Sequence, residues 1–352
     1  MHAGMAAASE ITKEETQVSS NDNIHPRLDV YVWDMDETLI LLNSLLKSSY
    51  AEAFNGLKDV QKGVELGKMW ENLILKLCDD HFFYEQVKFD FFLFKYFRWF
   101  VFSCGELVWG GVSVLQIENY NKPFLDVLSK YDDGRDLSDY DFNQDELGSP
   151  HDDANKRKIA YRHRIISQKY LQGLHNILDH ETIKVWDDLY DKTDEYTDKW
   201  LSSARTFLKE CSGENKDAVS SIAYANTSTD STNSKHQHVN VLVTSGSLIP
   251  SLVKCLLFHL DSLITHENVY SSWDVGKVQC FRWIKERFNH PNVRFCVIGD
   301  GWEECEAAEI MRWPFVKIDP RPGKPHRFPG LTSKTVGHYF SVVYPDNEND
   351  EE

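Results

Sequence analysis

The sequence has few of the features that mark nucleic-acid-binding, secreted or disulfide-stabilised proteins. Acidic residues outnumber basic ones by 55 to 38, which gives a formal net charge of −17. Because neutralising phosphates needs clustered Lys and Arg, we expect no direct binding of nucleic acid. The seven cysteines form no Cys-x-x-Cys pair and lie mostly in apolar stretches. This is typical of reduced thiols in an intracellular protein and argues against a disulfide framework or a zinc site.

The N-terminus also lacks a secretory signal, because no positively charged segment there is followed by an apolar one. We therefore expect the protein in the cytoplasm, the nucleus or both, with no membrane partner. Residues 1–27 are small, polar and charged, and residues 346–352 are acidic. Both segments predict disordered tails.

Three short apolar segments predict buried parallel strands: Val30–Trp33, Val239–Val243 and Val293–Ile298. Each ends in polar residues, and helix-like stretches follow them near Asn43, Ile249 and Glu303. The repeated order of strand, turn and helix predicts an α/β fold with a doubly wound, mostly parallel sheet. The binding crevice of such a sheet lies at the carboxyl ends of its strands.

A long segment with helical texture separates the first two predicted strands. Apolar residues recur there at helical spacing in two runs: Ile166, Tyr170, Leu174 and Leu178; and Trp200, Leu201, Ala204, Phe207 and Leu208. We predict a helical cap domain inserted over residues 47–213. We expect a linker rich in Ser, Thr, Asn and Asp over residues 214–235, and an α/β core formed by residues 28–46 and 236–345.

The stretch from residue 87 to residue 116 is crowded with Phe, Trp and Val on all faces. Charges such as Lys88, Asp90 and Lys95 leave no apolar span of the roughly 20 residues that a transmembrane helix needs. Two interpretations stay open: a buried helix hairpin, and a translated, retained intron. We favour the intron, since removing the stretch joins two ordinary amphipathic segments, and a Val codon at its start and a Gln codon at its end permit splice signals. Sequencing the transcript tests this, and a constitutive exon without those signals contradicts it.

Two carboxylates follow the first predicted strand, at Asp34 and Asp36 in VYVWDMDETL. A carboxylate in this place can attack phosphorus, while a second one two positions on can protonate the leaving oxygen and then activate water. Taken alone, however, Asp-x-Asp is also typical of a solvated turn.

The other two predicted strands end in groups that suit a phosphate site. Thr244 and the backbone N–H groups after it can bind phosphate oxygens. Asp300 lies between two glycines, and Glu303 and Glu304 follow it. Carboxylates clustered in this way would repel each other without a cation, and their oxygen ligands favour Mg²⁺. Lys277 can offset the negative charge of nucleophile and substrate, although an isolated Lys is also an ordinary surface residue.

The order Asp-x-Asp, Thr, Lys and Gly-Asp resembles the haloacid dehalogenase superfamily. Within it, five segments are similar to the catalytic domain of the Eyes absent protein tyrosine phosphatases: WDMDETLILLNSLL, RKIAYRHRIISQKY, VNVLVTSGSLIPSLVKCLLFHL, ENVYSSWDVGKVQCFRWIKERF and CVIGDGWEE. The similarity spans roughly residues 28–345, apart from 87–116. It implies a haloacid dehalogenase-like core with a cap.

The resemblance also implies a role for each motif residue. Asp34 is the nucleophile and a Mg²⁺ ligand, and Asp36 is the acid and base that also offers its backbone carbonyl to the metal. Asp300 completes the protein ligands of the metal. The phosphate contacts are Thr244 and Lys277. Glu304 takes the place of the second acidic residue of the last motif, where Glu instead of Asp implies a water-mediated role.

The substrate that the resemblance implies is protein phosphotyrosine, attacked by an aspartate. In agreement, no cysteine of the chain begins a Cys-x5-Arg phosphate loop; Cys305 and Arg312 miss that spacing by one residue. Animal members carry a long N-terminal region associated with transcriptional activation, whereas short polar N-termini like this one are typical of plant members. Two alternatives remain open: a phosphatase of small metabolites, and a non-catalytic partner of a transcription factor.

Overall fold

The computed structural model describes residues 27–84, 124–148, 150–213 and 237–345. The segment 87–116, the predicted linker 214–235 and the two predicted tails, apart from residue 27, lie outside these residues. In the part of the chain that is described, no helix is long and apolar enough to cross a membrane.

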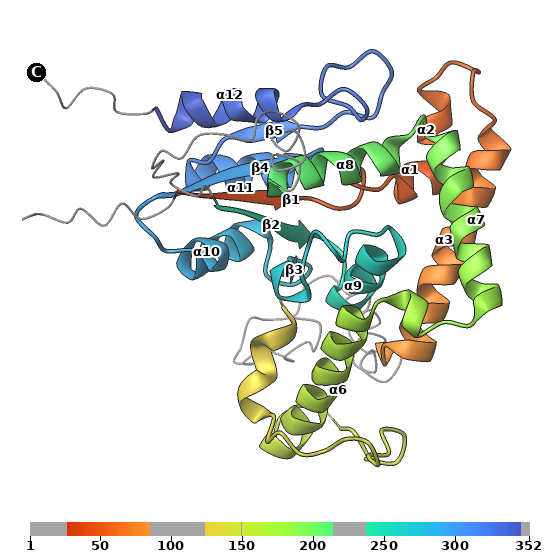
Figure 1. Ribbon diagram of the computed structural model, residues 1–352, viewed down its shortest axis with the longest axis vertical. Helices are drawn as coiled ribbons and strands as arrows, with labels where there is room; N and C mark the ends of the chain where they lie inside the picture. Colours follow the sequence, from red (N-terminus) through yellow and green to blue (C-terminus); the bar gives the residue numbers. More distant parts are fainter. Residues whose placement is uncertain (1–26, 85–123, 149, 214–236, 346–352) are drawn as a thin grey trace, which may run out of the picture.

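A single parallel sheet lies at the centre of the described structure (Figure 1). Its strands are β1 (Leu28–Trp33), β2 (Gln237–Thr244), β3 (Val269–Ser271), β4 (Val293–Gly299) and β5 (Phe315–Lys317). Their order is β3-β2-β1-β4-β5, and every neighbouring pair is parallel. The predicted α/β fold and its three buried strands are confirmed. The two strands of three residues, β3 and β5, were not predicted.

Helices cover both faces of this sheet, because alternate side chains of each strand are buried on opposite sides. Val30 and Val32 of β1 pack in one hydrophobic cluster with residues of α10 (Lys277–Arg287) and α11 (Trp302–Met311). Trp33 of β1 packs on the other face, with residues of three further helices. These are α8 (Trp200–Ser212), α9 (Leu248–Leu257) and α12 (Ser333–Val343).

Between β1 and β2, the described residues form mainly helices: α1 (Leu42–Leu46), α2 (Ser49–Glu52), α3 (Val60–His81), the 3-10 helix η1 (Leu125–Tyr131), α6 (Asp153–Gln172), the 3-10 helix η2 (Leu174–Asn176), α7 (His180–Tyr196) and α8. A third 3-10 helix, η4 (His266–Asn268), precedes β3. Helices α3 and α7 lie side by side beyond one end of the sheet (Figure 1). Their buried residues Trp70 and Trp186 belong to the same hydrophobic cluster as Trp33 and Ile298 of the sheet. The division of the chain into core and cap stays a prediction.

One predicted helical run is wrong at its end. Ile166 and Tyr170 are buried on α6, but α6 ends at Gln172. Gly173 follows with φ of 74°, a left-handed conformation that glycine adopts without steric cost and that stops the helix. Leu174 therefore lies in η2, and Leu178 lies outside any helix.

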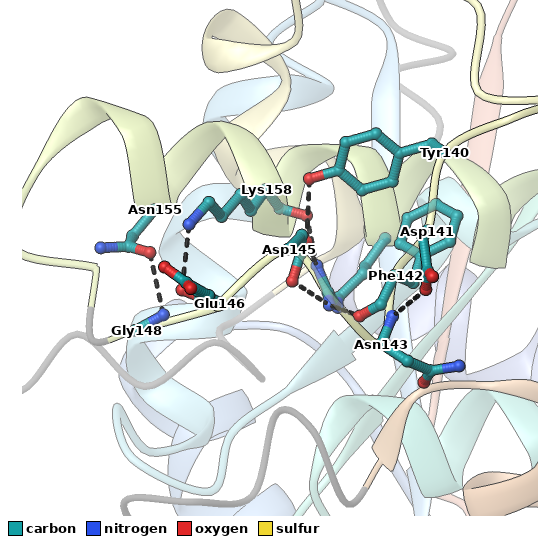
Figure 2. Close-up of polar contacts among 10 residues, drawn as sticks. Tyr140, Asp141, Phe142, Asn143, Asp145, Glu146, Gly148, Asn155 and Lys158 are labelled. Atoms are coloured by element: carbon teal, nitrogen blue, oxygen red, sulfur yellow. Dashed lines mark hydrogen bonds and ion pairs between the residues drawn. The ribbon is translucent and has the colours of Figure 1, made fainter.

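A buried ion pair fixes the loop between η1 and α6. Arg162 on α6 is 1% exposed and donates hydrogen bonds of 2.7 Å and 3.0 Å to the two carboxylate oxygens of Asp145. The Tyr140 hydroxyl also donates to Asp145, at 2.9 Å (Figure 2). Lys158 lies one turn before Arg162 on α6, and its Nζ donates a hydrogen bond to the carbonyl oxygen of Glu146 (Figure 2). An acidic loop is thus attached to α6 by paired charges.

Candidate active site

The strand order of the sheet places its switch point between β1 and β4. After β1 the chain continues to β2 and β3 on one side, and β4 then leads to β5 on the other side. Ligands of open α/β sheets bind at the carboxyl ends of the strands at such a point. Asp34 follows β1 directly, and Asp300 follows β4. The topology therefore brings these two carboxylates together, as the sequence pattern predicted.

A tight turn after β1 sets the position of Asp34. The backbone N–H of Asp34 donates to the carbonyl of Ile298 on β4, at 2.9 Å. The carbonyl of Met35 accepts from three following N–H groups, those of Thr38, Leu39 and Ile40. The chain thus folds back at once, which keeps the side chains after β1 at the edge of the sheet.

Asp34 is buried, and both of its carboxylate oxygens are hydrogen bonded. Lys277 Nζ lies 2.6 Å from Oδ1, and the Thr38 hydroxyl donates to Oδ2 at 3.1 Å. Burial raises the pKa of Asp34, while the Lys277 ammonium acts in the opposite direction. Lys277, the first residue of α10, is itself buried and also forms an ion pair with Glu304. The carboxylate is therefore fixed in orientation by a cation and a hydroxyl.

Asp300 lies close enough to Asp34 for the two carboxylates to repel each other. The Thr38 hydroxyl oxygen is 3.4 Å from Asp300 Oδ1 as well as 3.1 Å from Asp34 Oδ2. One hydroxyl has a single proton, so it can donate to only one of these oxygens at a time. Burial and the charge of Asp34 raise the pKa of Asp300 to about 6. A cation between the two carboxylates would remove this repulsion.

These donors fit a hard cation such as Mg²⁺, which takes oxygen ligands. Within the described residues, no group of three or more His, Cys, Asp or Glu is arranged to hold a metal by side chains alone. The carboxylate of Asp36 is paired with Lys254. The protein ligands that the predicted site offers are therefore the carboxylates of Asp34 and Asp300 and the main-chain carbonyl of Asp36. Glu304 Oε2 is buried, and among the described residues no group donates a hydrogen bond to it, so it can accept one from a water molecule in the site.

The side chain of Asp36 lies in an ion pair that the sequence pattern did not reveal. Lys254 on α9 places its Nζ 2.7 Å and 2.9 Å from the two carboxylate oxygens of Asp36. Lys254 on α9 therefore holds the carboxylate of Asp36, which was predicted to act as acid and base. The pairing joins two residues that are 218 positions apart in the chain.

The predicted phosphate-binding residues line one pocket with the carboxylates. It has a volume of about 240 Å³, and its lining consists of Asp34, Asp36, Thr244, Ser245, Lys277, Asp300, Gly301, Trp302, Glu303 and Glu304. Thr244 is fully buried at the end of β2, and its hydroxyl oxygen accepts the backbone N–H of Gly246 at 3.1 Å. The structure thus brings all six predicted site residues to the carboxyl edge of the sheet. The role of each of them stays a prediction.

Known proteins resemble this chain over nearly its whole length. No protein-family model matches it. Protein phosphatase EYA of Arabidopsis thaliana, however, is 55% identical over 325 residues, which cover 92% of this chain and 93% of that protein. The chain belongs to the Eyes absent family. The human Protein phosphatase EYA2 is 31% identical over 305 residues, and the Drosophila melanogaster Protein phosphatase eya is 27% identical over 322 residues. These two alignments cover 82% and 86% of the present chain, but only 47% of the human protein and 35% of the Drosophila protein.

Sequence reasoning missed three residues around the site of this Eyes absent chain. Thr38 was part of the quoted motif, but its hydroxyl between Asp34 and Asp300 is visible only in three dimensions. Lys254 had no signal beyond its place on a predicted helix. Trp302 stands in the quoted motif beside Asp300, and nothing in the sequence indicated that its ring would be exposed.

Proposed function

We propose that this chain is a Mg²⁺-dependent protein tyrosine phosphatase that forms an aspartyl-phosphate on Asp34. The relatives named above are protein phosphatases by name, which supports dephosphorylation. The observation that carries the aspartate chemistry is the contact of 2.6 Å between Lys277 Nζ and Asp34 Oδ1, at the switch point of a parallel sheet. A buried carboxylate oriented by a buried ammonium suits attack on a phosphoryl group.

In the first step of the proposed reaction, Asp34 attacks phosphorus in line. A bond forms between its carboxylate oxygen and phosphorus, and the bond from phosphorus to the tyrosyl oxygen breaks. Protonated Asp36 gives its proton to the leaving phenolate. In the second step Asp36 accepts a proton from water, whose oxygen attacks phosphorus and releases inorganic phosphate and free Asp34.

The remaining residues of the pocket position the phosphoryl group and balance its charge. Lys277 offsets negative charge, and the Thr244 hydroxyl can donate to a phosphoryl oxygen because its own oxygen accepts from Gly246. Lys254 contacts both carboxylate oxygens of Asp36. When one of these oxygens carries the proton for the leaving group, Lys254 can keep its hydrogen bond to the other and so hold Asp36 in place.

Asp34, the carbonyl of Asp36 and Asp300 are the residues proposed to hold Mg²⁺. The ion would neutralise charge on the phosphoryl oxygens and on the two carboxylates. We extend the proposal to a haloacid dehalogenase-like core, with the helices between β1 and β2 as its cap. A transcription-factor partner and a place in the cytoplasm or nucleus remain proposals that rest on the family resemblance.

The test is hydrolysis of a phosphotyrosine peptide by the full chain, with Mg²⁺ and with EDTA. We expect turnover with Mg²⁺, loss of turnover with EDTA, and no turnover by Asp34→Asn. Asp188→Asn is the matched control, since the exposed carboxylate of Asp188 pairs only with exposed Lys192 among the contacts described. Faster hydrolysis of phosphosugars than of the peptide would favour a metabolite phosphatase, and activity of Asp34→Asn equal to wild type would contradict the mechanism.

A further inference from the structure

Trp302 differs from its neighbours in the candidate active site. Among the ten described residues that line the pocket, it alone has a large apolar side chain; the others are charged, hydroxyl-bearing or glycine. Its side chain is 70% exposed. The pocket is therefore polar where the phosphoryl group would bind, and apolar at one position of its lining.

The exposure of Trp302 contrasts with four buried indoles of the fold, although Trp273 is also 53% exposed. Buried Trp33, Trp70, Trp186 and Trp200 each donate their indole N–H to an acceptor inside the protein. In the described part of the chain, the side chain of Trp302 makes no hydrogen bond and no ring contact. Both the face and the N–H of its indole are thus available to a ligand. A ligand that covers the ring would gain free energy, because burying a Trp ring is strongly favourable.

The backbone of Trp302 is nevertheless well fixed relative to the reacting groups. It is the first residue of α11 and stands two positions after Asp300. Ala307 and Ala308 attach the same helix to the sheet within the cluster that includes Val297 of β4. The indole therefore extends from a rigid element at the edge of the pocket, which limits the entropy lost when a ring packs on it.

We infer that Trp302 is a specificity-determining residue, whose indole stacks on the aromatic ring of an aryl phosphate while the phosphoryl group lies at Asp34. The inference rests on the proposed phosphatase function and adds a reason for selecting aryl over alkyl or acyl phosphates. An aryl phosphate has a charged end that matches Lys277 and a flat apolar end that matches an indole. A phosphate without a ring gains nothing from Trp302.

The experiment compares kcat/KM for p-nitrophenyl phosphate and for acetyl phosphate, both with Mg²⁺, in the full chain. Both substrates have good leaving groups, but only the first has a ring. We expect Trp302→Ala to lower the ratio of the two kcat/KM values about five- to tenfold, mainly through KM for the aryl substrate. Trp302→Phe should restore most of the ratio, because a phenyl ring still stacks.

Ile310→Ala is the matched control, since Ile310 is a 53% exposed apolar residue on the same helix and does not line the pocket. It should leave the ratio as in wild type. An unchanged ratio in Trp302→Ala, or an equal loss with both substrates, overturns the inference and leaves the proposed function standing. If wild type hydrolyses neither substrate, the proposed function fails and the inference fails with it.

Discussion

Lys254 Nζ lies within 2.9 Å of both carboxylate oxygens of Asp36, so a residue of α9 holds the side chain proposed as acid and base. The pair is only partly buried, and its two members come from elements on the same edge of the sheet. Lys254 does not line the pocket that contains Asp34. We therefore propose that it is a positioning residue that acts through Asp36.

Replacing Lys254 by Met should therefore lower kcat with little change in KM. Without its partner, the Asp36 carboxylate samples rotamers that cannot reach the leaving oxygen, and we expect a loss of about tenfold, a fraction of the full effect of general acid catalysis. Lys254→Arg should retain most of the activity, because it keeps the cation. Steady-state kinetics on a phosphotyrosine peptide distinguishes these outcomes, and a rise in KM alone would assign Lys254 to substrate binding instead.

Replacing Gly299 by Ala should displace two side chains of the candidate site. A Cβ there would lie 2.8 Å from Glu304 Cγ and 3.3 Å from Asp34 Cβ, so these side chains must shift. We expect Gly299→Ala to lose about a hundredfold in kcat/KM, as misplaced catalytic groups do. Gly337→Ala is the control, because nothing lies near that position of α12, and it should raise stability by about 0.5–1 kcal/mol. Wild-type activity of Gly299→Ala would show that Asp34 tolerates displacement.

The buried pair of Arg162 and Asp145 should be costly to break. Arg162→Met leaves a buried carboxylate without its cation, which typically destabilises a protein by about 3–5 kcal/mol. Arg162→Met combined with Asp145→Asn should recover part of this loss, since the amide carries no charge. Lys192→Met, which breaks an exposed pair with Asp188, should change the free energy of unfolding by less than about 0.5 kcal/mol. Urea unfolding followed by circular dichroism measures all three, and equal stability of the single and double variants at the buried pair contradicts the argument.

The contribution of His259 to stability should fall as the pH drops from about 7 to about 4. Burial, and then the nearby Arg205, lower the pKa of His259 to about 4 from its ordinary value of 6.5. The unfolded chain therefore takes up this proton first as the pH falls below 6.5, and each such uptake favours unfolding. Well above pH 6.5 the ring is neutral in both states, and it contributes no slope.

The variant that tests this is His259→Asn, since Asn tolerates the φ of 55° at this position and does not titrate. The loss of unfolding free energy between pH 7 and pH 5 should be smaller in the variant than in wild type. Urea unfolding at the two pH values gives both numbers. Equal losses would mean that the ring of His259, which stacks against Trp186, is not titrating in this range.

The sequence predicted the long strands and the edge of the sheet where the site lies, because each depends on local patterns. Runs of apolar residues marked β1, β2 and β4, and the polar residues after them marked Asp34, Thr244 and Asp300. Strands β3 and β5 have three residues each, too few for a periodic signal, and exist because they pair with β2 and β4.

Other features depend on contacts between distant residues and could not be predicted. The pairing of Lys254 with Asp36 and the exposure of Trp302 follow from packing in three dimensions. The end of α6 at Gly173 could have been predicted, because Gly in a helical run is a common stop signal. The apolar spacing from Ile166 to Leu178 outweighed that signal.

The most direct test of the aspartyl-phosphate is chemical trapping of the phosphorylated residue. The full chain is quenched during turnover of a phosphotyrosine peptide with Mg²⁺, reduced with sodium borohydride, digested and analysed by mass spectrometry. Reduction of an aspartyl-phosphate gives homoserine, and we predict homoserine at position 34 in wild type and none in a sample quenched without substrate. An enzyme that turns over the peptide but shows unmodified Asp34, or homoserine at another position, would contradict Asp34 as the nucleophile.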